Sequence, residues 1–126
     1  MKILTIGDVV GEAGLDALHA LLRRIKRDVG ADFVIVNGEN AAGNGVLPRQ
    51  AEDIFDAGAD AVTLGNHAFG KQQIVPYLDE HSDILRPANL APQSPGQGWG
   101  IFDGPQGSRL LVIDLIGRCD MKYGPD

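Results

Sequence analysis

Polar residues that can act in catalysis or bind metal ions follow three short apolar runs of the chain. The runs, at residues 2–6, 32–36 and 59–64, are typical of buried strands, and each ends close to a glycine. The polar residues are Asp8 after the first run, Asn37, Glu39 and Asn40 after the second, and Asn66 and His67 after the third. Carboxylate and amide oxygens together with an imidazole form a ligand set suited to Mn, Fe or Zn.

Two carboxylates in one cluster repel each other, which raises their pKa values unless a cation neutralises them. A metal site therefore explains why three strands end in the same kind of residue. The alternative is that each residue caps a helix or satisfies a turn, which is a common role for Asp and Asn after strands. The capping or turn role is a good explanation for any one of these residues, but a poorer explanation for three strands that end in the same way.

The segments between these runs have the hydrophobic spacing of helices. Leu15, Leu18 and Leu22 recur at three- and four-residue intervals in residues 15–29, which predicts an amphipathic helix that ends at Gly30. A second helix is expected to begin with Pro48 in its first turn, and a third is expected over residues 72–79. Three strand, loop and helix units in series predict a parallel sheet covered by helices. The working site of such a sheet lies at the carboxyl ends of its strands.

The chain changes character after residue 83. A short strand is expected within residues 84–90, and apolar runs at 99–103 and 109–115 flank a Gly-Pro-Gln-Gly segment that is typical of a hairpin. Residues 122–126 are expected to form a loop. The 126 residues therefore predict an α/β fold in which a layered parallel or mixed sheet has flanking helices, within one domain.

Composition excludes several classes of protein. The net charge of −6 argues against a general nucleic-acid binder. No apolar stretch approaches the roughly eighteen residues of a membrane span, and the N-terminus lacks a signal-peptide pattern, so we expect a cytoplasmic protein. The glycines of residues 7–14 lack both the Gly-Lys-Ser/Thr ending of a P-loop and the dinucleotide-binding spacing, which disfavours a P-loop NTPase and a Rossmann dehydrogenase.

Three blocks of the sequence resemble the calcineurin-like metallophosphoesterase superfamily, and in particular its YmdB-type bacterial phosphodiesterases. The blocks are Ile6-Gly-Asp8, Asn37-Gly-Glu-Asn-Ala-Ala-Gly43 and Leu64-Gly-Asn-His67. Further agreement comes from Arg86-Pro-Ala-Asn89, Gly98-Trp-Gly-Ile-Phe102 and Asp114-Leu-Ile-Gly-Arg118. The resemblance covers essentially the whole chain, but only the N-terminal half of the domain found in such proteins.

The resemblance implies a role for each matching residue. Asp8 and Asn40 would bind one metal ion, Asn66 would bind the other, and Glu39 would bridge them. His67 would be the acid that protonates the leaving oxygen, since imidazole titrates near neutral pH. Two divalent ions, with Fe or Mn expected and Zn or Mg as alternatives, would lie about 3.5–4 Å apart and hold the attacking hydroxide. Asn37 is expected to order its loop without binding metal.

The sequence departs from the family pattern where further imidazoles are expected. The family completes its two-metal site with another His and a Gly-His-x-His block, whereas this chain has His only at positions 19, 67 and 81. We expect His19 and His81 to be solvated surface groups. The remaining ligands would hold metal weakly, which predicts little or no catalysis by this polypeptide alone. Residues 68–70 read Ala-Phe-Gly, where many relatives have a Trp and an acid after the His, so the substrate contacts of those relatives are not carried over to this point.

Two functions therefore remain open. The first is a two-metal phosphodiesterase that acts on a small phosphodiester such as a cyclic nucleotide, of which this chain is a fragment. The second is a non-catalytic module that binds phosphate or a nucleotide and assembles with a partner, including a homo-oligomer. The apolar residues 110–113 of the second hairpin strand would form an exposed edge that invites pairing with another chain. Two half-sites joined in a dimer are disfavoured, because both copies lack the same imidazoles.

Overall fold

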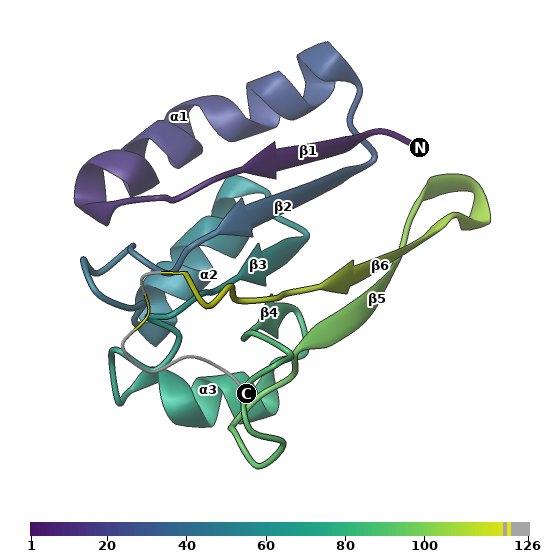
Figure 1. Cartoon of the computed structure of the whole chain (residues 1–126). Helices are drawn as coiled ribbons and strands as arrows, with labels where there is room; N and C mark the ends of the chain where they lie inside the picture. The colour runs from purple at the N-terminus through teal and green to yellow at the C-terminus, as the bar shows by residue number, and fades with distance from the viewer. Residues whose placement is uncertain (120, 122–126) are drawn as a thin grey trace.

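Three helices, a four-stranded sheet and a separate hairpin make up the computed structural model, which describes residues 1–119 and 121 (Figure 1). The sheet has the order β1-β2-β3-β4, and all of its strand pairs are parallel. Its strands are β1 (Ile3–Ile6), β2 (Phe33–Asn37), β3 (Ala61–Thr63) and β4 (Ile84–Leu85). The helices are α1 (Gly11–Val29), α2 (Pro48–Ala57) and α3 (Ile74–Glu80). The α/β fold expected from the sequence is confirmed.

The parallel register brings the strand ends to one rim of the sheet. Ile6 pairs with Val36 at the end of β1, and Asn37 pairs with Thr63 at the end of β2. The pairing continues into the loops, because the amide of Val9 donates to the carbonyl of Asn37 over 3.0 Å. Chain segments that are about thirty residues apart in sequence therefore leave the sheet at the same place.

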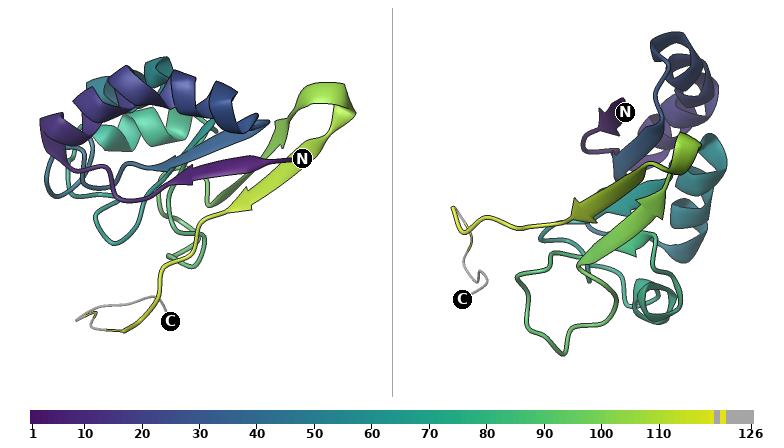
Figure 2. Two further views of the ribbon diagram at one scale, coloured as in Figure 1. Left: turned by 90° about the horizontal axis from the view of Figure 1, so that it is seen from above. Right: turned by 90° about the vertical axis from the view of Figure 1, so that its right-hand side faces the viewer.

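All three helices cover the same face of the sheet (Figure 2). The core between them is built from fully buried aliphatic side chains of α1, α2, α3, β2 and β3, including Leu22, Ile54, Leu78, Val36 and Val62. Gly38 lies where an added methyl group would press on Ile54 and Val62, so this position keeps α2 close to the sheet. The sequence predicted a sheet covered by helices, and the structure shows that they cover only one side of it.

Helix α1 begins earlier than the sequence pattern indicated. We expected it over residues 15–29, but it begins at Gly11, and Gly14 also lies within its first turns. A Cβ on Gly14 would approach Val9 Cγ1 to 2.9 Å, so glycine permits the helix to pack directly on the loop that follows β1. The predicted end is confirmed, since Gly30 adopts the left-handed conformation that caps α1.

The hairpin predicted after residue 98 is confirmed. β5 (Trp99–Asp103) and β6 (Arg109–Ile113) pair antiparallel and are joined by a 3₁₀ turn, η1 (Pro105–Gly107). Gly104 lies so close to the ring of Phe33 that a side chain would overlap it, so the hairpin packs over one end of the sheet face that has no helices.

The strand expected within residues 84–90 is shorter than predicted, because it stops at Leu85. The residues after it pair instead with the segment that follows β6, where the amide of Ala88 donates to the carbonyl of Asp114. The side chain of Asn89 bonds both backbone groups of Ile116. The loop expected at residues 122–126 lies outside the described residues. Of the helices that the structure describes, none is long and apolar enough to span a membrane.

The contact between α2 and the sheet predicts a test of the core. Ile54→Ala should lower the free energy of unfolding by about 2–5 kcal/mol, because Ile54 has no exposed surface and its removal leaves a cavity beside Gly38. Val29→Ala, at a side chain that is 41% exposed, should change it by less than about 0.5 kcal/mol. Urea denaturation followed by circular dichroism measures both, and similar losses in the two variants would contradict this account of the core.

Candidate functional site

The loops that follow β1, β2 and β3 meet at the carboxyl rim of the sheet, and a chain of hydrogen bonds connects them. Asn40 Nδ2 donates to Asp8 Oδ1 over 2.7 Å, and Asn40 Oδ1 lies 2.8 Å from His67 Nδ1. The amide of His67 also points at Glu39 Oε2, at 3.3 Å. Four of the residues predicted from the sequence therefore come together, one or two from each strand end.

Asp8 is held in an uncommon backbone conformation. Its φ of 48° lies in the left-handed region, which Asp tolerates better than most residues but which still costs energy outside glycine. The residues around it are fixed by pairing with the next loop, through the bond from Val9 to Asn37 and the bridge between Val10 and Asn40. Such local strain is found at functional sites more often than elsewhere, and here it aims an exposed carboxylate at the rim.

Glu39 is half-buried and packs directly on the backbone of the third loop. A Cβ on Gly65 would overlap both carboxylate oxygens of Glu39, so only glycine leaves room for the carboxylate at this position. The loop that carries Glu39 is closed by backbone hydrogen bonds, including one from the amide of Gly45 to the carbonyl of Glu39 over 2.8 Å. Gly65 is a residue whose importance our sequence analysis missed, although it lies within the block at residues 64–67.

Asn40 sets the orientation of its two neighbours. Its amide nitrogen can only donate, so the partner is an acceptor oxygen of Asp8. Its oxygen accepts from His67 Nδ1 when that nitrogen carries the proton, which leaves Nε2 as the ring nitrogen able to exchange a proton with another molecule. The oxygen has a second lone pair, which can bind a cation while the hydrogen bond to His67 persists.

Asn66 lies between Gly65 and His67, and its side chain is exposed. It lines a hollow of about 320 Å³ whose other walls include Phe69, Leu90 and Ser94. The hollow therefore combines a polar amide at the rim of the site with apolar and aromatic surface beside it.

The donors at the rim suit a hard or borderline cation, but strong ligands are few. Across residues 1–119 and 121, no group of three His, Cys, Asp or Glu side chains is placed to hold a metal ion. A cation would depend on Asp8 and Glu39 supplemented by amide oxygens, as the sequence indicated. The Oδ1 atom of Asn37, at the end of β2, is buried and accepts no hydrogen bond from the described residues. The loop-ordering role predicted for Asn37 is thus not carried by this oxygen, and a buried acceptor of this kind fits a nearby cation.

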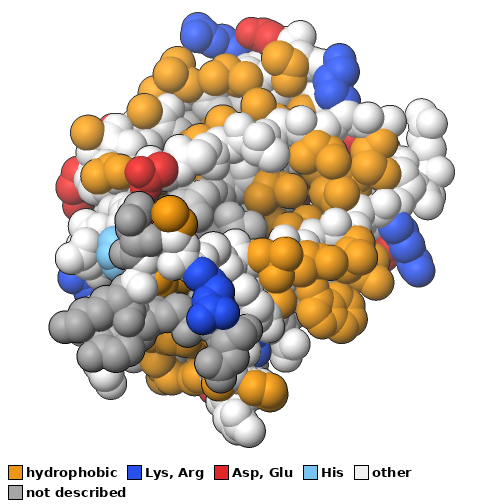
Figure 3. Space-filling model, in the orientation of Figure 1, with side chains coloured by type: hydrophobic (Ala, Val, Ile, Leu, Met, Phe, Trp, Pro, Cys, Tyr) orange, Lys and Arg blue, Asp and Glu red, His pale blue; other side chains and the backbone are white. Residues whose placement is uncertain are grey.

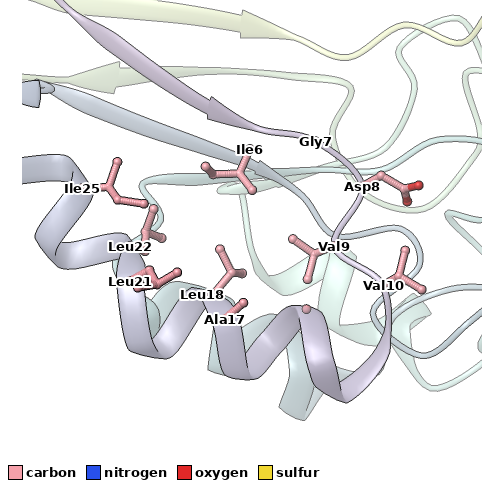
Figure 4. Close-up of a pocket in the computed structure, with 11 residues that line it drawn as sticks. Ile6, Gly7, Asp8, Val9, Val10, Ala17, Leu18, Leu21, Leu22 and Ile25 are labelled. Carbon is pink, nitrogen blue, oxygen red and sulfur yellow. The ribbon is translucent and has the colours of Figure 1, made fainter.

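An apolar hollow of about 260 Å³ lies beside Asp8, between the end of β1 and helix α1 (Figure 4). Its walls include Ile6, Leu18, Leu21 and Ile25, and the carboxylate of Asp8 points away from them. Because its side chains other than Asp8 are aliphatic, this hollow offers no side-chain donors for a phosphate group. The polar side chains lie on the rim.

The two other histidines lie away from the cluster on different elements. His19 is exposed on α1, as predicted. His81 follows α3 and is only partly exposed, because its ring stacks on Tyr77 with centroids 3.7 Å apart and its Nδ1 lies 2.9 Å from the Tyr77 carbonyl. The prediction of a solvated surface group was therefore wrong for His81.

A buried carboxyl group forms a hydrogen bond with the backbone just before the third loop of the rim. Asp114, just after β6, is 9% exposed and accepts a hydrogen bond from the amide of Leu64 over 3.0 Å. The pKa of the Asp114 carboxyl is raised to about 6, mainly by burial and in part by the Glu39 carboxylate, while hydrogen bonds from the backbone amides of Leu64 and Leu115 oppose the rise. Asp114 begins one of the sequence blocks that resemble the family, but its role as a buried carboxyl was not predicted, although an acid that ends an apolar strand is the available signal.

A family model described as "YmdB-like protein" matches residues 4–125 of the chain. Over 119 residues the chain is 40% identical to a 2',3'-cyclic-nucleotide 2'-phosphodiesterase of Bacillus subtilis, covering 94% of this chain and 45% of that protein. The chain thus spans about half the length of the curated relatives it matches.

Two solved structures share this fold. A protein of Thermus thermophilus superposes with a TM-score of 0.88 at 37% identity, over 100% of this chain and 49% of its own. A phosphatase of Mycoplasma pneumoniae superposes with a TM-score of 0.82 at 30% identity, over 93% of this chain and 43% of its own.

The raised pKa of Asp114 predicts a difference in the pH dependence of stability. The folded-state pKa of about 6 lies above the ordinary value of 3.8, so stability from the neutral carboxyl is full below pH 4 and is lost as the pH rises through 6. The side chain of Asp114→Asn stays neutral at every pH. The free energy of unfolding of this variant, relative to that of the wild type, should therefore be higher at pH 7.5 than at pH 4.5. Urea denaturation at both pH values measures this difference. An unchanged difference between the two proteins would show that Asp114 ionises without cost.

Proposed function

Because the chain belongs to the family of YmdB-like proteins, we propose that it supplies one half of the catalytic site of a metal-dependent phosphodiesterase. The observation that carries this proposal is the chain of hydrogen bonds from Asp8 through Asn40 to His67. Glu39 joins this chain, because its carboxylate accepts a hydrogen bond from the backbone amide of His67. This link joins three strand ends, and it places an acid, an amide and an imidazole within one small area.

The oxygens at the rim would hold two divalent cations. Asp8 and Asn40 are proposed for one ion, Asn66 for the other, and Glu39 for both, because its two oxygens face the backbone at Gly65 where the loops converge. Bound cations of this kind neutralise the phosphoryl oxygens and make water a better nucleophile at neutral pH. Fe or Mn suits these oxygen donors and single imidazole best, with Zn or Mg as alternatives.

His67 is proposed as the acid that gives a proton to the leaving oxygen. Asn40 engages Nδ1 and fixes the orientation of the ring, so the proton would leave from Nε2. Imidazole titrates close to neutral pH, which favours proton transfer at the pH of the cell. Asn40 is then a residue with two tasks, since it binds a cation and positions the acid.

The substrate class that fits is a small phosphodiester with an organic group on each side of phosphorus. The hollow beside Asn66 offers the ring of Phe69 and the side chain of Leu90 to such a group, while the phosphate would stay at the polar rim. A cyclic nucleotide satisfies this description, and the name of the Bacillus subtilis relative points the same way. Cytoplasmic location stays a prediction.

The chain by itself would be a poor catalyst. His67 is the only imidazole in the cluster, and the described residues hold no conventional group of three metal ligands. The relatives are about twice as long, and we propose that the half of the protein beyond this chain brings the missing imidazoles. Metal binding by this chain alone is therefore expected to be weak, and turnover to be close to background.

A second function is favoured by one observation. Several large apolar side chains are exposed on the hairpin, which suits a module that assembles with a partner and binds phosphate without hydrolysing it. The two functions differ in one measurement, which is hydrolysis of bis-p-nitrophenyl phosphate with Mn²⁺ by the chain joined to the remainder of a relative. Turnover supports the enzyme, and an inert but assembled protein supports the module.

The close packing of the Glu39 carboxylate on Gly65 predicts that a larger residue at position 65 lowers metal affinity. Gly65→Ala should weaken Mn²⁺ binding about tenfold or more, because the new methyl group displaces the carboxylate. Gly117→Ala is the matched control, since a Cβ there meets nothing within 4 Å, and it should leave the affinity unchanged. Isothermal titration with Mn²⁺ of this chain joined to the unmatched part of the Bacillus subtilis relative measures both. Equal affinity in the two variants would remove Glu39 from the proposed site.

The proposed division of roles predicts different losses for Glu39 and His67. In a chimera of this chain with the unmatched part of the Bacillus subtilis relative, Glu39→Ala should abolish the binding of both metal ions. His67→Ala should lower turnover about 10²-fold or more while the metal content stays within about twofold, because His67 moves a proton and holds no cation. Metal analysis and turnover of bis-p-nitrophenyl phosphate provide the two readouts, and an equal loss of metal in both variants would refute the assignment.

A further inference from the structure

The outward face of the hairpin is apolar along both of its strands. Trp99 pairs with Ile113, and Ile101 pairs with Leu111, so these four side chains project from the same face. Each of them is more than half exposed, and Leu115 continues the same alternation at 67% exposed. We call these five residues the apolar face (Figure 3).

The opposite face of the hairpin is also apolar, and it is already covered. Phe102, Leu110 and Val112 alternate with the residues of the apolar face and are buried or half-buried. A hairpin with one solvated side alternates apolar and polar residues, whereas a strand covered on both sides is apolar throughout. The composition of β5 and β6 is therefore that of an inner layer with material on each side.

The parallel sheet, like the hairpin, has one covered face and one face that is partly uncovered. Sheets in which every strand is parallel occur almost only with both faces covered. Here the helices cover one face (Figure 2), and the hairpin packs on the other at Phe33. Ile3, which pairs with Phe33 in the sheet register and therefore lies on the same face, remains 42% exposed. Side chains of the sheet and hairpin thus leave a broad apolar surface on the side without helices (Figure 3).

We infer that the apolar face is the docking surface for the other half of a YmdB-like domain, and that this half binds it even when supplied as a separate polypeptide. The inference rests on the proposed function for its account of what that half contributes to the site. Its independent support is length, because the chain accounts for 45% of the Bacillus subtilis relative and 49% of the Thermus thermophilus protein.

A second copy of this chain fits the surface less well as an occupant. It would bring the same carboxylates and amides, together with a net charge of −6 that repels the first copy. The chemistry expected of the occupant is instead a layer with an apolar inner surface that carries imidazoles toward the rim. Burial of aromatic and aliphatic side chains at the centre of such a contact supplies most of its affinity.

The test is to coexpress the tagged chain with the part of the Bacillus subtilis relative that it does not match. Affinity purification followed by size exclusion with light scattering should yield a one-to-one complex. Ile101→Lys or Leu111→Lys should lower its recovery about tenfold or more, because each places a charge in the centre of the contact. Val29→Lys introduces the same charge at an exposed apolar position of α1, and it should leave the complex unchanged.

Trp99 provides a second measurement, because it is the only tryptophan of the chain and is 55% exposed. The chain labelled with 5-fluorotryptophan is refolded together with the unlabelled partner half, and the fluorine resonance should shift and lose its sensitivity to solvent isotope. This readout reports on the apolar face even where a lysine variant folds poorly.

Each outcome decides between distinct claims. Absence of a complex, or a complex insensitive to Ile101→Lys and Leu111→Lys, overturns the docking inference. Self-association of the chain that these variants abolish also overturns it, in favour of a second copy. A complex that forms as expected but binds no Mn²⁺ and does not hydrolyse bis-p-nitrophenyl phosphate supports the docking inference and refutes the proposed function.

Discussion

The parallel pairing of β1, β2 and β3 is the constraint on which the rest of the molecule depends. Parallel strands must end on the same side, so each crossover through a helix returns the chain to one rim. The register then continues beyond the strands, through the bond from Val9 to Asn37 and the bridge between Val10 and Asn40. The loops are thereby fixed against each other before any side chain of the site is considered.

Glycine and one strained residue convert this rim into a site. Gly65 admits the Glu39 carboxylate to the backbone of the third loop, and Asp8 adopts a left-handed conformation just before Val9, which pairs with the second loop. Asn40 then spans the distance from Asp8 to His67 with a single amide group. The resulting geometry is ordered by hydrogen bonds among these side chains, which fixes their positions at some cost in local strain.

The same layered arrangement explains why one side of the molecule is apolar and open. Helices bury one face of the sheet, and the hairpin packs on the other at Phe33 while presenting its second face to solvent. Asp114 links the two regions, because it follows β6 and bonds the amide of Leu64 just before the third loop. A layer that covers the hairpin would therefore contact a segment, β6 and Asp114, that is hydrogen-bonded to the chain just before the third loop.

The sequence by itself determined the α/β class, the strand, loop and helix order, the hairpin and the polar residues of the strand ends, because these depend on local hydrophobic spacing and on glycine positions. It misjudged the start of α1, since the packing of Gly14 on Val9 is a contact between elements. It also missed the roles of Gly65 and Asp114, whose partners Glu39 and Leu64 lie far away in sequence. Only the tertiary structure decided those long-range contacts and which apolar residues remain exposed, because a two-residue period shows that Leu111 and Val112 face opposite sides but not which side is covered.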